Sequence, residues 1–165
     1  MVVLGIDPGY AIVGYGLVET KNQRLKALQY GVIRTAAELP IATRLLEIYN
    51  DLTGLLTAFS PDCVSIEKLY FNTNETTAIN VSQARGVIVL ACEQAGVPIF
   101  EYTPLQVKMA AVGYGRAEKA QVMEMTRQIL KLKEIPKPDD AADALAIAVC
   151  HAHTARCPLT GGTHV

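Results

Sequence analysis

The pattern of apolar and polar positions divides the chain into strands followed by alternating helices and strands. Residues 2–7 are apolar until Asp7, which is typical of a strand buried on both faces. Residues 12–19 and 25–34 are rich in β-branched and aromatic side chains, and "KNQR" between them suits a hairpin turn. The first part of the chain therefore predicts three strands.

Helical spacing begins after these strands. Apolar residues recur every three or four positions from Ile41 to Phe59, which predicts an amphipathic helix ended by Ser60-Pro61. The remaining predicted elements are a strand in "DCVSIEKLYF", a helix over 76–95 closed by Gly96, a strand in "VPIFEYT", and helices at about 104–111, 117–131 and 139–154.

This order of elements predicts an α/β fold with a single domain over residues 1–154 and a flexible tail over 155–165. Three successive strands and then alternating helices and strands indicate a mixed five-stranded sheet, antiparallel on one side and parallel on the other. Helices are expected on both faces. Ligands of such sheets bind beyond the carboxyl ends of the parallel strands.

Acidic residues occur where a ligand would be expected. Asp7 ends the first strand, although Asp7-Pro8-Gly9 also suits a simple type II turn with φ > 0 at Gly9. Glu67 ends the strand "VSIE" in the same way, or else is a solvated residue paired with Lys68.

The last helix adds further acids in "KPDDAADALAIA". Asp139 is a natural N-cap after Pro138, and Asp140 and Asp143 share one helix face, although all three also suit a helix start. The small side chains that follow would let this helix lie close to the sheet. If it does, Asp7, Glu67, Asp140 and Asp143 converge, and their repulsion calls for a divalent cation.

Oxygen ligands favour Mg²⁺ or Mn²⁺, and two such ions ~4 Å apart can hydrolyse a phosphodiester. A zinc site in "CHAHTARC" (Cys150, His151, His153, Cys157) is disfavoured, because His151 and His153 point in different directions on a helix. We interpret this segment as a fraying helix end.

Basic and aromatic residues near the acids suit a nucleic-acid substrate. Lys108 and Lys119 could stabilise charge on a phosphate, although each could equally be a solvated lysine. Arg116 lies near them, and Tyr70, Phe71, Asn72 and Asn74 follow the strand that carries Glu67. The two aromatic residues could stack on bases or form a local hydrophobic plug.

Composition limits the class of protein. The chain has 165 residues and a net charge of −1, is 50% hydrophobic and 19% charged, and shows no apolar run of membrane-spanning length. Without a recognisable leader, a cytoplasmic protein is expected. The charge argues mildly against a nucleic-acid binder but allows a local basic lining.

The motifs "GIDPG", "SIEKLYF", "QARGV", "EYTPLQVK", "GYGRAEK" and "DDAADALAIA" occur in an order that resembles the RuvC-type Holliday-junction resolvases, from Val2 to about His153. "GIDPG" alone also resembles actin-like ATPases, but this chain is too short for their second half. The resemblance implies a ribonuclease-H-like fold and a homodimer that cuts two opposed strands of a four-way junction with Mg²⁺, two ions per subunit, or Mn²⁺ in its place.

The resemblance also implies roles for single residues. It makes Asp7, Glu67, Asp140 and Asp143 metal ligands and Lys108 and Lys119 catalytic lysines, and it leaves open whether Tyr70 or Phe71 enters the junction. Arg85 of "QARGV" joins Asn72, Asn74 and Arg116 as a DNA-binding candidate. Helix 76–95 is the candidate dimer interface, or else a buried core helix, and RuvA and RuvB are the implied partners. The alternative is a catalytically inactive junction-binding module, which should lack one of the acids.

Overall fold

The computed structural model describes residues 1–69, 75–155 and 163–164. The strands in these ranges are β1 (Val2–Asp7), β2 (Ile12–Lys21), β3 (Arg24–Arg34), β4 (Cys63–Glu67), β5 (Ile99–Tyr102) and β6 (Thr163–His164). The helices are α1 (Ile41–Phe59), α2 (Glu75–Gln94), α3 (Pro104–Val112), α4 (Lys119–Ile129) and α5 (Asp139–Thr154).

The strands form one mixed sheet in the order β3-β2-β1-β4-β5-β6. β1, β2 and β3 pair antiparallel, whereas β1 pairs parallel with β4, and β4 with β5. This confirms the predicted arrangement of five strands. The two-residue β6, within the segment predicted to be a tail, adds an antiparallel edge beside β5.

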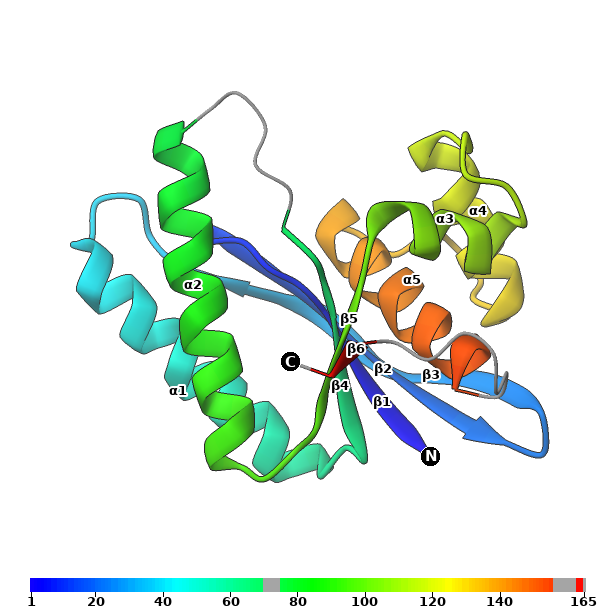
Figure 1. The fold of residues 1–165 in the computed structure, drawn as a ribbon, viewed down its shortest axis with the longest axis horizontal. Helices are drawn as coiled ribbons and strands as arrows, with labels where there is room; N and C mark the ends of the chain where they lie inside the picture. Colours follow the sequence, from blue (N-terminus) through cyan, green and yellow to red (C-terminus); the bar gives the residue numbers. More distant parts are fainter. Residues whose placement is uncertain (70–74, 156–162, 165) are drawn as a thin grey trace.

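Helices cover both faces of the sheet, as predicted. Helices α1 and α2 pack together on one face, and α3, α4 and α5 lie on the other (Figure 1). Apolar residues of α1 and α2 form one buried cluster with the sheet, and residues of α5 form two more. Within the described ranges, no helix is both long and apolar enough to cross a membrane.

The first hairpin turn and the ends of α1 and α2 form where the sequence predicts them. Asn22 and Gln23 have φ of 49° and 63°, as a type I′ hairpin turn requires. Ser60 ends α1 in the left-handed conformation ahead of Pro61, and Gly96 follows α2 with φ of 67°.

Two predictions about the backbone at Gly9 and Asp139 are wrong. Gly9 does not adopt a positive φ, so Asp7-Pro8-Gly9 is not a type II turn. Glycine is required there because a Cβ would overlap the carbonyl oxygen of Ile12. Asp139 is not an N-cap either, because Pro138 occupies that position and Asp139 is the first residue of α5.

The end of α5 is a packed part of the core rather than a fraying end. His151 is 4% exposed, and its ring nitrogens contact the Tyr102 hydroxyl at 2.8 Å and the Cys63 Sγ at 3.2 Å. Burial lowers the pKa of His151 and raises that of the Cys150 thiol to about 12. These side chains therefore join α5 to β4 and β5, while Cys157 lies outside the described residues.

Candidate active site

The first two acids, Asp7 and Glu67, lie at the ends of two adjacent strands. β1 and β4 run parallel with Ile6 beside Ile66, so Asp7 and Glu67 end neighbouring strands at the same edge. Side chains alternate along a strand, and Ser65, two residues before Glu67, donates its hydroxyl to the Ile147 carbonyl of α5 at 3.3 Å. Glu67 therefore faces α5, and so does Asp7 by the same alternation from Gly5, which lies against α5.

Glycines bring α5 directly onto the sheet. A Cβ at Gly5 would overlap backbone atoms of Ala144 and Ala148, and a Cβ at Gly14 would overlap the carbonyl group of Asp140. Gly14 is the cross-strand partner of Asp7, so the first turn of α5 lies over the end of β1. The predicted close contact between α5 and the sheet is confirmed, and it places Asp140 beside Asp7.

A small pocket of about 220 Å³ contains the rest of the predicted machinery. Its lining includes Glu67, Asp143, Lys108 and Lys119. Lys119, the first residue of α4, places its Nζ 2.8 Å from Asp143 Oδ2 and 3.8 Å from Asp139 Oδ2. Two acids and two lysines from different parts of the sequence thus meet at one edge of the sheet, with Asp7 and Asp140 beside them.

Burial, and then the mutual repulsion of the acids, perturbs their ionisation. Burial, followed by the charges of Asp143, Glu67 and Asp140, raises the pKa of Asp7 from 3.8 to about 7, against the opposing effect of Lys119. Burial also raises the pKa of Glu67 and of Asp143. The hydrogen bond to Asp143 raises the pKa of Lys119. Together, Asp7, Glu67, Asp140 and Asp143 carry more negative charge than Lys108 and Lys119 compensate.

The donor set suits a hard divalent cation. All the converging acids offer oxygen atoms, which Mg²⁺ prefers, and a cation would offset both the burial and the neighbouring negative charges that raise the pKa of Asp7. As the side chains stand, however, no group of three or more His, Cys, Asp or Glu in the described ranges is arranged to hold a metal ion. A metal ion at this edge would therefore need the carboxylates to lie closer together than they do here.

The predicted DNA-binding residues have different surroundings. Arg116 is exposed in the loop between α3 and α4. Arg85 forms an ion pair with Glu101, and both side chains are more than four-fifths buried, so its guanidinium faces β5 rather than solvent. The four remaining candidates, Tyr70, Phe71, Asn72 and Asn74, lie outside the described residues.

Arg44 is a residue near the site that sequence reasoning missed. It is 7% exposed, and its Nε donates to Thr35 Oγ1 at 2.8 Å while Nη2 donates to the Tyr10 carbonyl at 3.2 Å. The guanidinium also lies 4.4 Å from the centre of the Tyr10 ring. Arg44 thus holds the loop that follows Asp7. The available signal was its spacing, because it stands four residues before Ile48 and eight before Leu52, on the buried face of α1.

Comparison with known proteins identifies the family. The model of a family described as crossover junction endodeoxyribonuclease RuvC matches residues 3–151. The chain belongs to the RuvC family. The RuvC of Brevibacillus brevis is 58% identical, over 92% of each chain, and that of Clostridioides difficile is 52% identical over the full length of both.

A solved structure agrees with this assignment. The RuvC of Thermus thermophilus, in complex with a Holliday junction substrate, superimposes with a TM-score of 0.93 at 39% identity, covering 99% of each chain. The ribonuclease-H-like fold expected from the RuvC resemblance is therefore confirmed.

Proposed function

We propose that this chain resolves four-way (Holliday) DNA junctions by metal-dependent hydrolysis of two opposed strands, in recombination and repair. The observation that carries the proposal is the convergence of Asp7, Glu67 and Asp143 with Lys119 at the sheet edge of a RuvC-family chain. An inactive junction-binding module is not supported, because all four predicted acids are present.

We assign Asp7, Glu67, Asp140 and Asp143 as ligands of two Mg²⁺ ions, which Mn²⁺ could replace. When bound, such ions supply an activated water and stabilise the leaving oxygen. Asp7 and Glu67 fix the site to the sheet, and Asp140 and Asp143 close it from α5. Lys108 and Lys119 line the pocket where the scissile phosphate would lie, and their charges would oppose the charge that develops on it.

We also propose a cytoplasmic homodimer. A four-way junction has two equivalent strands to cut, and a two-fold dimer presents two equivalent sites. The candidate interface is α2, on which Ile79 and Leu90 are 59% and 53% exposed and lie eleven residues, three helical turns, apart.

Tyr70 or Phe71 would enter the junction, with Asn72, Asn74 and Arg116 near it, and RuvA and RuvB would be partners. For Arg85, DNA contact would require its ion pair with Glu101 to open.

A mobile synthetic four-way junction, labelled on each strand in turn, tests this function. With Mg²⁺ we expect paired nicks at matching positions on two opposed strands, and EDTA should abolish them. Asp7→Asn should bind the junction without cutting it, whereas Asp51→Asn, the same change at an exposed position of α1, should cut normally. Degradation of linear duplex, or full activity of Asp7→Asn, would contradict the proposal.

A further inference from the structure

A groove of about 830 Å³ lies at the end of the sheet remote from the acids. It runs between the β2–β3 hairpin and the segment that follows α4. Glu19, on one wall, pairs with Val2 at the start of β1, whereas Asp7 ends that strand. The length of β1 puts roughly 17 Å between the groove and the acids. The groove is therefore separate from the candidate active site.

The floor of the groove is apolar. Leu25 and Ala27 of β3 line it together with Leu130 and Leu132. Leu130 belongs to a buried cluster with Leu145 of α5, and the other three pack against that cluster while staying partly accessible. The groove thus opens a part of the core to solvent, which favours a partner with apolar side chains to cover it.

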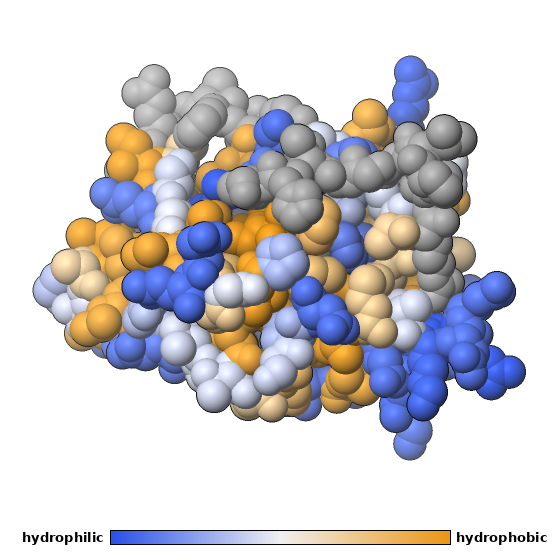
Figure 2. Space-filling view, turned by 60° about the horizontal axis from the view of Figure 1, so that its bottom comes forward, coloured by the Kyte–Doolittle hydropathy of each residue, from blue (hydrophilic) through white to orange (hydrophobic). Residues whose placement is uncertain are grey.

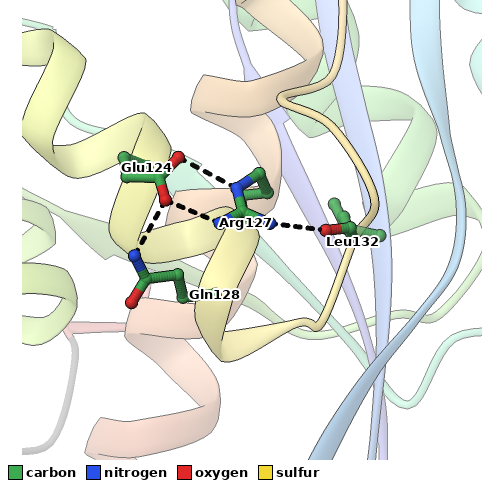
Figure 3. A network of polar contacts seen from close by, with 4 residues as sticks. All are labelled: Glu124, Arg127, Gln128 and Leu132. Atoms are coloured by element: carbon green, nitrogen blue, oxygen red, sulfur yellow. Dashed lines mark hydrogen bonds and ion pairs between the residues drawn. The ribbon is translucent and has the colours of Figure 1, made fainter.

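Hydrogen bonds fix one wall of the groove in place. Arg127 donates to the Leu132 carbonyl at 2.9 Å and is itself held by Glu124, at 2.7 Å and 2.9 Å, as Figure 3 shows. Gln128 donates to the same carboxylate at 2.8 Å. The segment after α4 is therefore pinned to the last turns of that helix, and the groove is formed before any partner arrives.

The rim of the groove is basic. Lys21, Arg24, Lys26 and Lys131 line it, with Glu19 as the one acid of its lining. All four cations are exposed, and none forms an ion pair with another described residue. Figure 2 shows hydrophilic residues projecting together at the end of the molecule where the β2–β3 hairpin lies. This local excess of positive charge contrasts with the net charge of −1 of the chain.

Two of these cations face each other in the hairpin, where their repulsion is unfavourable. Lys21 and Arg24 are directly opposite each other across the β2–β3 pair, next to the turn. Like charges at such positions destabilise a hairpin, whereas opposite charges stabilise it. A bound anionic partner would offset the repulsion between Lys21 and Arg24.

We propose that the groove binds an acidic peptide segment of a partner protein, with carboxylates on the basic rim and apolar side chains on the floor. A DNA backbone would satisfy the cations but has no apolar groups to cover Leu25 and Leu132. Because the groove lies remote from the acids, the partner could be held while a junction is being cut. The contact would thus recruit the nuclease without blocking its site.

Titration with fluorescein-labelled peptides tests the proposal. One short peptide alternates Asp or Glu with Leu or Phe, and a second replaces the apolar residues by Ser. We expect the first to bind about tenfold more tightly than the second, and to shift the amide resonances of residues 19–27 and 130–132. A short DNA duplex serves as the competing ligand.

Lys21→Glu is the decisive variant. It creates an opposite-charge pair with Arg24, so its hairpin should be no less stable than that of the wild type. We expect it to weaken binding of the first peptide about tenfold, while Arg34→Glu, at the other end of β3, changes binding little. Equal binding of both peptides, equal effects of both variants, or displacement of the peptide by duplex would overturn the proposal. Junction cleavage by Lys21→Glu should stay unchanged, so failure here is distinguishable from failure of the proposed nuclease function.

Discussion

Replacing Asp7 by Asn should stabilise the metal-free protein while it abolishes cleavage. The pKa of Asp7 is raised from 3.8 to about 7, chiefly by burial and then by Asp143, Glu67 and Asp140. Between these two pH values the folded protein keeps a proton that the unfolded chain releases, so the stability contributed at this position falls as pH rises. At about 1.4 kcal/mol per pH unit, the total reaches about 4 kcal/mol at pH 8.

Urea unfolding in EDTA, followed by circular dichroism at fixed protein concentration from pH 4 to 8, measures this effect. The free energy of unfolding of Asp7→Asn should exceed that of the wild type by up to about 4 kcal/mol at pH 8 and by little at pH 4. Mg²⁺ should reduce the difference at pH 8 by stabilising the wild type. The exposed control Asp51→Asn should stay within about 0.5 kcal/mol of the wild type throughout. Parallel pH profiles of Asp7→Asn and wild type, or a variant that is less stable at pH 8, would refute the reasoning.

Three further predictions concern other parts of the fold. Lys119→Met should lower the single-turnover cleavage rate about 100-fold while junction affinity changes less than about threefold; an unchanged rate would make Lys119 a surface lysine. Gly14→Ala should reduce both cleavage and melting temperature because its Cβ overlaps α5, whereas Gly54→Ala, in open space on α1, should raise stability by about 1 kcal/mol. Burial lowers the pKa of His151, so the stability of the wild type should fall as pH drops below about 6.5. The variant His151→Phe should lack this fall, although it loses the contact with Tyr102. Equal pH slopes of the two proteins in calorimetry would contradict this.

The sequence predicted the sheet and its covering helices because these depend on local periodicity. The apolar run of β1 extends to Asp7, and the helical spacing of apolar residues in α1 extends to Phe59. In the structure both elements end at these residues. The meeting of Asp7 and Glu67 was also predictable, since parallel strands share a carboxyl edge.

Features that depend on contacts between distant residues could not be predicted in this way. β6 is two residues long and is defined by its pairing with β5, so it has no pattern of its own. Arg85 looked free to bind DNA because nothing near it in the sequence indicates Glu101. Gly9 suggested a turn of the wrong type, because the nearness of the Ile12 carbonyl, and not a positive φ, requires glycine there.

The glycine contact between α5 and the sheet has a consequence for how this enzyme tolerates change. Main-chain atoms of Ala144, Ala148 and Asp140 lie where Cβ atoms of Gly5 and Gly14 would be, so side-chain volume does not set the spacing between these layers. We therefore expect substitutions in the buried cluster beneath α1 and α2 to alter the separation between the acids of α5 and those of the strands only slightly. The geometry of the acidic edge thus depends on main-chain contacts more than on the packing of the rest of the core, and relatives with diverged interiors should keep it.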